Sequence, residues 1–179
     1  EGIKNGLWAG IDSIEHGIFL DEEAIELMKE RNVYFVPTLN APYQIVKAGT
    51  KRGVPAFAVE KSKAVVRTHI ESVRKARRAG VPIAMGTDAG TSFNLHGENV
   101  MELELLTKVG MTSMEAITAG TKVASEVLGL EKWLGTLESG KQADLIVLDG
   151  DPLDDITLLQ RKERIRAIMK DGKFFKCQL

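Results

Sequence analysis

One histidine and one aspartate stand at comparable places in the sequence, each directly after a short apolar segment. His16 ends the β-compatible segment 11–16, and Asp88 follows the apolar segment 82–86. Imidazole and carboxylate groups on rigid strand ends are typical ligands of a catalytic metal ion. An aspartate in such a place can also accept the proton of a metal-activated water. The alternative is structural: a histidine that packs against a helix and an aspartate that caps a turn.

The segments around these two residues predict how they are positioned. A helix is expected over residues 21–31, with acidic side chains in its first turn, and a second strand over 33–36. A long loop (39–55) and a long helix (56–79) then lead to the strand before the aspartate. Apolar strands that alternate with helices are typical of parallel βαβ units, in which ligands bind at the carboxyl ends of the strands. The sequence therefore predicts an α/β fold with the histidine and the aspartate at one edge of a parallel sheet.

The character of the sequence changes near residue 134. After two further helices, the apolar segment 143–148 is typical of a buried strand, and the Asp-Gly pair at 171–172 predicts a β-hairpin. We expect two units: residues 1–134 with parallel α/β character and residues 135–179 with antiparallel β character.

Composition limits the classes of function. The 179 residues carry 24 Lys and Arg against 25 Asp and Glu, a net charge of −1, which argues against binding nucleic acid through bulk positive charge. No apolar run approaches the roughly 18 to 20 residues that cross a bilayer, so no membrane partner is expected. The single cysteine, Cys177, excludes an intramolecular disulfide and indicates a reducing, cytoplasmic compartment. Because the sequence begins at Glu1 inside a predicted helix, a preceding leader stays an open alternative.

Three stretches occur in a fixed order along the chain. They are GIDSIEHG (residues 10–17), GTDAG (86–90) and GTLESGKQADLIVLD (135–149), the last being the most specific. Together they resemble the amidohydrolase superfamily, and within it the prolidase-like and imidazolonepropionase-like enzymes. The resemblance covers essentially the whole chain.

The resemblance implies a (β/α)8 TIM barrel with a small β-sandwich, of which this chain would hold the C-terminal part. Strands six to eight and the C-terminal share of the sandwich would be present. His16 would then be a metal ligand, and Asp88 a metal ligand or general base. The implied cofactor is a divalent metal, zinc by default, with one or two ions in the complete enzyme and manganese or iron as alternatives. The implied reaction is hydrolysis of an amide C–N bond, of a dipeptide or an N-acyl amino acid, by a metal-activated water.

Part of the family pattern has no counterpart in this chain. The His-x-His pair of the first strand and the ligands of the fourth and fifth strands are missing. The three histidines are His16, His69 and His96, and no two of them are spaced as His-x-His. A barrel takes roughly 200 to over 400 residues, more than precede the β unit here. We therefore expect the chain to need the missing N-terminal half or self-association, and we expect a homo-oligomer.

Other side chains have two interpretations each. His96, in the loop after the last predicted parallel strand, is a candidate substrate contact or a plain surface histidine. Tyr43, after the preceding strand, is a candidate substrate-binding phenol or a packing residue. Thr87 and Thr91 are expected to orient the aspartate carboxylate, and His69 is expected to be an exposed or half-packed helical residue without a functional role.

Two other classes of function stay open. The first is a non-catalytic interaction or assembly module that keeps the fold, and the second is a nucleotide-using α/β enzyme. The glycine-rich stretch 86–90 resembles a phosphate-binding loop only superficially, because it lacks the G-x-x-x-x-G-K-[ST] and G-x-G-x-x-G spacings. A nucleotide-using enzyme is therefore the weakest of the alternatives.

Overall fold

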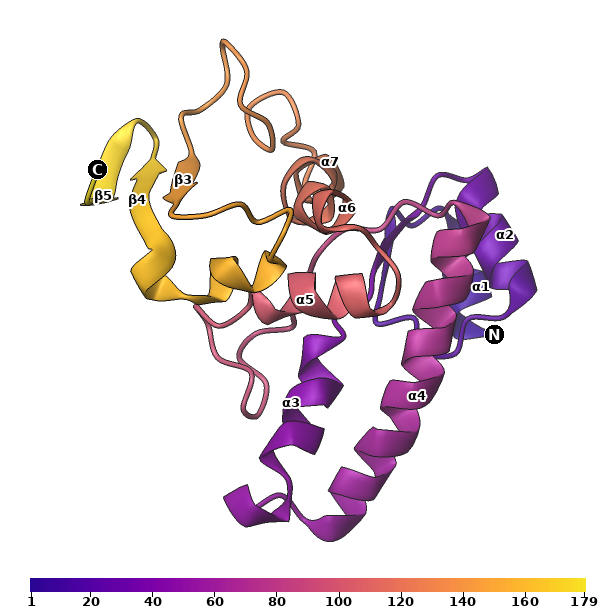
Figure 1. The fold of residues 1–179 in the computed structure, drawn as a ribbon. Helices are drawn as coiled ribbons and strands as arrows, with labels where there is room; N and C mark the ends of the chain where they lie inside the picture. Colours follow the sequence, from indigo (N-terminus) through magenta and orange to yellow (C-terminus); the bar gives the residue numbers. More distant parts are fainter.

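The computed structural model describes all residues of the chain, 1–179, and its N-terminal part contains a parallel strand layer (Figure 1). β1 (Ser13–Glu15) pairs in parallel with β2 (Tyr34–Val36). Residues 82–86 continue the layer on the other side of β2, through a parallel bridge between Phe35 and Ile83. The third predicted strand is thus a bridge segment rather than a full strand. All three segments run in the same direction, as the alternation of strands and helices predicts.

Helices connect these segments. α1 (Gly2–Ala9) precedes β1, and α2 (Glu22–Glu30) joins β1 to β2. α2 begins where the Asp21 side chain accepts a hydrogen bond from the backbone N–H of Ala24 (2.9 Å), so the acidic start of this helix is confirmed. α4 (Ala56–Ala79) has the predicted bounds.

The prediction of a long loop over residues 39–55 is wrong. α3 (Asn40–Ala48) and a short 3-10 turn (Thr50–Arg52) occupy most of it. Pro42 lies in the first turn of α3, where a backbone N–H has no partner within the helix and its absence costs little. α3 and α4 form a hairpin that projects from the body of the molecule (Figure 1).

A second group of helices covers the bridge segment. α5 (Met101–Lys108) is followed by α6 (Ser113–Thr118) and α7 (Ala124–Val127), which are joined by a π-helical turn (Ala119–Val123). The backbone N–H of Met85 donates to the Ala119 carbonyl in that turn (2.9 Å), which ties the helix to the bridge segment.

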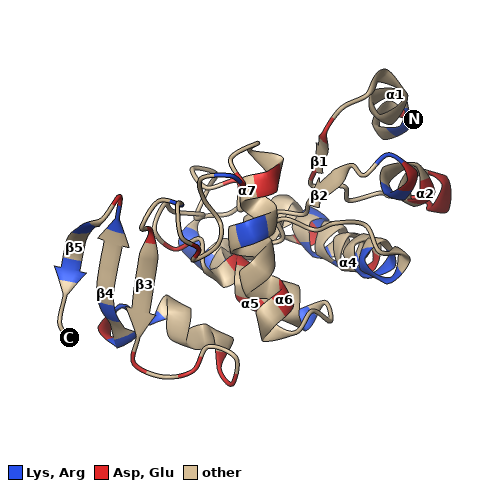
Figure 2. Ribbon diagram, turned by 90° about the horizontal axis from the view of Figure 1, so that it is seen from above, with Lys and Arg blue, Asp and Glu red and all other residues tan.

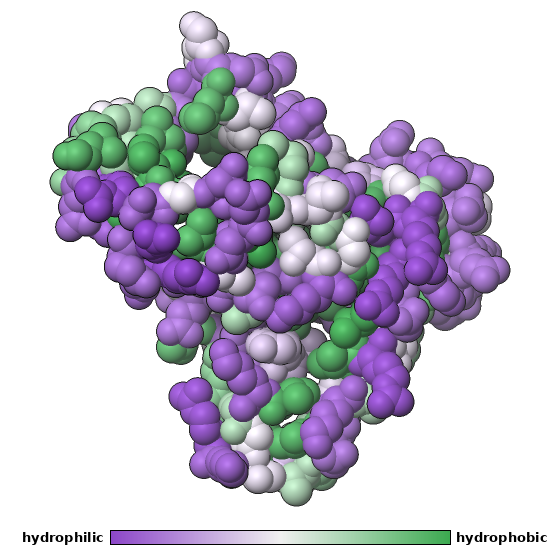
Figure 3. Space-filling model, viewed as in Figure 1, coloured by the Kyte–Doolittle hydropathy of each residue, from purple (hydrophilic) through white to green (hydrophobic).

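The C-terminal residues form a separate antiparallel sheet in the order β3 (Leu145–Leu148), β4 (Ile165–Lys170) and β5 (Lys173–Cys177). The hairpin predicted at 171–172 connects β4 to β5. Two 3-10 turns, Ile156–Gln160 and Lys162–Arg164, lead into β4. The sheet lies at the opposite end of the molecule from α1 and α2 (Figure 1), and apolar surface is exposed over this region (Figure 3).

The main hydrophobic core contains 21 buried residues and joins the parallel layer to α2, α4, α5 and α6. Phe35 of β2 is fully buried at its centre. A second small cluster, Ala48, Val54 and Val59, stabilises the α3–α4 hairpin. Acidic and basic residues are interspersed along the helices and the sheet (Figure 2). None of the helices is long and apolar enough to cross a lipid bilayer.

Candidate functional site

The carboxyl ends of the three parallel segments meet at one edge, and a residue with left-handed backbone follows each of them. The φ angles are 65° at His16, 55° at Thr38 and 54° at Asp88. A non-glycine residue in this conformation costs about 1 to 2 kcal/mol and is found mainly where function or packing demands it. The structure therefore places the histidine and the aspartate at the same edge, with the threonine from the middle strand between them.

The His16 ring is held in one orientation. Its Nδ1 atom lies 2.6 Å from the Thr38 hydroxyl oxygen, and that hydroxyl donates its own proton to the Pro37 carbonyl (2.6 Å). Because a hydroxyl has a single proton to donate, Thr38 accepts from Nδ1–H. The lone pair of His16 is thereby located on Nε2, the arrangement found in histidines that bind metal. No pattern in the sequence indicates this role of Thr38.

Asp88 is held by its backbone and not by its side chain. Its carbonyl oxygen accepts hydrogen bonds from the Thr91 hydroxyl (2.9 Å) and the Asn94 amide (3.0 Å). The expectation that Thr87 and Thr91 orient the carboxylate is wrong, since Thr91 reaches the carbonyl and Thr87 contributes its own carbonyl to Asn94. The carboxylate is exposed and makes no hydrogen bond or ion pair within the chain, so it is free to act on a ligand.

Two glycines allow the strand ends to pack closely. A Cβ on Gly17, directly after His16, would lie 2.4 Å from the Phe35 ring. A Cβ on Gly86 would lie 2.4 Å from Cγ1 of Val36. Any larger residue at either position would push the edge apart.

The prediction for His69 is wrong, because the side chain is only 1% exposed. It lies on the inner face of α4, and neither ring nitrogen has a hydrogen-bond partner. Burial lowers the pKa of His69 to about 4, opposed by the nearby backbone of His16 and Pro37. The signal was available in the sequence: Val73 and Ala76 follow His69 at helical spacing and mark the same buried face. His69 thus packs beneath the edge that carries His16.

Glu102 is a second buried titratable residue that sequence reasoning missed. Its side chain is fully buried, and its two carboxyl oxygens accept hydrogen bonds from the backbone N–H groups of Leu39 (2.8 Å) and Asn40 (2.7 Å). Burial raises the pKa of Glu102 to about 8, against the opposing effect of these two donors. The sequence signal is a carboxylate in line with Leu105 and Leu106 on the apolar face of α5.

The two predicted substrate contacts lie in different surroundings. His96 is exposed, and its Nε2 atom lies 3.6 Å from the position of a Cβ on Gly90, so the ring lies over the loop that carries Asp88. Tyr43 is partly buried against the main core, with the Lys47 ammonium 6.0 Å from the centre of its ring. Its position favours the packing interpretation.

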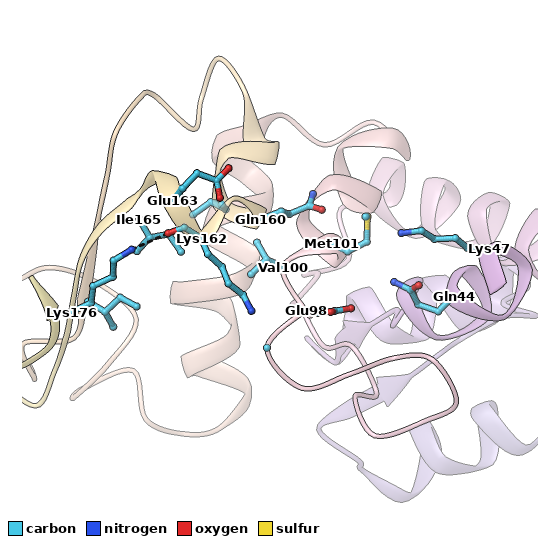
Figure 4. Close-up of a pocket in the computed structure, with 13 residues that line it drawn as sticks. Gln44, Lys47, Glu98, Val100, Met101, Gln160, Lys162, Glu163, Ile165 and Lys176 are labelled. Atoms are coloured by element: carbon cyan, nitrogen blue, oxygen red, sulfur yellow. Dashed lines mark hydrogen bonds between the residues drawn. The ribbon is translucent and has the colours of Figure 1, made fainter. Parts of the chain in front are cut away.

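A cavity of about 820 Å³ lies elsewhere, between α3, the loop before α5 and the C-terminal sheet (Figure 4). Its wall carries charges of both signs, among them Lys47, Glu98 and Glu163. Lys176 donates to the Lys162 carbonyl there (2.9 Å). Neither His16 nor Asp88 lines this cavity, so it is distinct from the edge described above.

The donor atoms at the edge fit part of a metal site. His16 Nε2 and the free Asp88 carboxylate are suitable ligand types for zinc. No group of three or more His, Cys, Asp or Glu side chains in this chain is arranged to hold a metal ion.

Sequence and structural comparisons define the class. The Amidohydrolase family model matches residues 2–175, and the chain belongs to this family. The resemblance inferred from the three motifs is thereby confirmed.

Its relatives include hydrolases that act on different compounds. The chain is 36% identical to ochratoxinase of Aspergillus niger over 177 residues, 98% of this chain and 36% of the relative. It is similar to the crystal structure of a Xaa-Pro dipeptidase with methionine bound in its active site (TM-score 0.87, 38% identity, 98% of this chain and 42% of that chain). It is also similar to a prolidase complexed with N-methylphosphonate-L-proline (TM-score 0.87, 32% identity, 98% and 43% covered). The chain thus spans 36% to 43% of the length of these proteins.

Proposed function

We propose that this chain supplies the C-terminal part of the active site of a metal-dependent amidohydrolase that cleaves an amide C–N bond. In this proposal the parallel layer corresponds to strands six to eight of a (β/α)8 barrel, and residues 135–179 form part of the accompanying sandwich. The remaining strands and metal ligands come from a segment outside these residues. The observation that carries the proposal is the Thr38-held ring of His16 at the same edge as the unengaged carboxylate of Asp88.

Each residue has a distinct task in the reaction. A divalent metal, zinc by default, would supply Lewis-acid activation when bound. His16 would hold that metal through its imidazole, and Thr38 keeps the ring in the required tautomer. The Asp88 carboxylate accepts a proton from the attacking water and returns it to the leaving nitrogen. His96, which lies over the same loop, contacts the substrate.

The relatives support the proposed substrate class. The named relatives include a dipeptidase and a prolidase with a proline phosphonate, which favours a dipeptide or an N-acyl amino acid. Both His16 and Asp88 are exposed at this edge, so a small molecule can reach them. In the proposal, the remaining strands complete the walls of the pocket.

The test uses the complete protein that contains this chain together with the remaining strands. Purified wild-type protein is expected to contain stoichiometric zinc and to hydrolyse members of a panel of dipeptides and N-acyl amino acids. Asp88→Asn is expected to preserve the fold and abolish turnover, and His16→Ala to lose metal. Wild-type turnover by Asp88→Asn would refute the assigned role. A complete protein without metal or activity would instead favour a non-catalytic assembly module.

A further inference from the structure

Three polar side chains beneath the catalytic edge are fully buried. Asn40, Asn94 and Glu102 each have an exposed fraction of 0%. A buried polar group costs about 1 to 3 kcal/mol unless it is hydrogen-bonded, so such groups persist where their bonds are made and used. These three residues, called the brace below, come from α3, the loop after Asp88 and α5.

The first half of the brace fixes the residue that holds His16. Glu102 binds the backbone N–H groups of Leu39 and Asn40, the two residues that follow Thr38. Thr38 is itself buried and left-handed, and its hydroxyl meets His16 Nδ1. Displacement of the Glu102 carboxyl would therefore move the hydroxyl that orients the histidine.

The second half of the brace fixes Asp88. The Asn40 amide donates to the Asn94 side-chain oxygen (2.6 Å), and the Asn94 amide donates to the carbonyls of Thr87 (2.5 Å) and Asp88 (3.0 Å). The Asp88 carboxylate has no hydrogen bond of its own within the chain. Its direction is therefore set by the left-handed backbone, whose carbonyl accepts from both Asn94 and Thr91.

We propose that Asn94, anchored through Asn40 by Glu102, is the positioning residue that fixes Asp88 relative to His16. This role rests on the function proposed above. None of the three side chains touches the reacting atoms; the brace acts by connecting two strand ends that each carry a single catalytic group. Misplacement of a catalytic group by about 1 Å can cost on the order of a hundredfold in rate.

The chain offers a matched control. Gln44 belongs to the same buried network, because its amide donates to the Asn40 oxygen (3.0 Å), but it makes no hydrogen bond to residues 87 or 88. Both Gln44→Ala and Asn94→Ala remove a buried amide that bonds to Asn40. Only Asn94→Ala also removes hydrogen bonds to the carbonyls of Thr87 and Asp88.

The experiment compares Asn94→Ala and Gln44→Ala in the complete, metal-loaded enzyme, each assayed at the same interval below its own melting temperature. Asn94→Ala is expected to lower kcat by about tenfold to a hundredfold, with KM changed by less than about threefold. Gln44→Ala is expected to stay within about twofold of wild type in both constants. If Asn94→Ala does not fold, Asn40→Ala interrupts the same connection and is expected to lower kcat at least about fivefold.

The possible results separate the two proposals. Equal kcat losses in Asn94→Ala and Gln44→Ala, or an unchanged kcat in Asn94→Ala, would overturn the positioning role. If Asp88→Asn still abolished turnover in that case, the proposed function would stand without the brace. Wild-type turnover by Asp88→Asn would refute the proposed function itself.

Discussion

Replacement of Glu102 by glutamine is expected to remove a pH dependence of stability that the wild-type protein has. Burial raises the pKa of this carboxyl from 4.5 to about 8, so the folded state holds the proton more tightly than the unfolded state. The contribution of Glu102 to stability is therefore fully present below about pH 4.5 and is lost as pH rises through about 8. Glutamine cannot titrate, so the variant lacks this slope.

The size of the effect follows from the shift. One pKa unit corresponds to about 1.36 kcal/mol, so the full shift is worth on the order of 5 kcal/mol, and about 3 kcal/mol of it is lost by pH 7. Glutamine also turns an amide NH₂ toward the N–H of Leu39 or Asn40, which costs about 1 to 3 kcal/mol at every pH. The wild type is expected to be the more stable protein in acid, with its advantage shrinking or reversing in base.

The assay is thermal unfolding of both proteins between about pH 5 and pH 9, with the difference in Tm plotted against pH. Other titrating groups contribute equally to both proteins and cancel. The infrared carbonyl band of a protonated carboxyl, present in the wild type at neutral pH and absent from Glu102→Gln, reports the proton directly. A Tm difference independent of pH, without that band, would refute the reasoning and mean that the two backbone donors keep the carboxylate ionised.

Two further substitutions test the edge itself. Thr38→Val removes the acceptor of the His16 Nδ1–H and is expected to speed zinc loss to a chelator by about tenfold to a hundredfold. Thr38→Ser keeps the hydroxyl and is expected to retain the metal. Equal rates of zinc loss from both variants would contradict the role of the hydroxyl. Gly86→Ala places a methyl 2.4 Å from Val36 and is expected to cost about 1 to 3 kcal/mol, seen as a lower Tm, while Gly2→Ala, with open space around it, serves as the control. An unchanged Tm in Gly86→Ala would mean that the strand ends tolerate a wider spacing.

Much of the fold could be predicted because local signals agreed with the final packing. The bounds of α4 follow from helical periodicity and the glycine at position 80, and the β4–β5 hairpin follows from the Asp-Gly pair. The edge location of His16 and Asp88 follows from parallel strand order alone. The helix over Asn40–Ala48 was not predicted, although its single proline, Pro42, lies in the first turn, where a proline is compatible with a helix.

The supporting residues of the site were harder to foresee, since their role depends on contacts between segments far apart in the sequence. Glu102 bonds to the backbone of residues 39 and 40, and Asn94 bonds back to residues 87 and 88. Helical spacing could have marked Glu102 and His69 as buried, but not what each would contact. No spacing rule links Thr38 to His16.

The left-handed backbone at His16 and Thr38 affects how variants of this protein should be selected. Glycine would adopt these backbone angles without the steric penalty that a histidine or threonine bears, so a library selected only for yield or heat resistance should accumulate glycine at these two positions. Variants with glycine at these positions would be more stable but would lack the imidazole or the hydroxyl on which the proposed activity depends. Any campaign to improve the protein therefore has to couple its selection to catalysis from the first round.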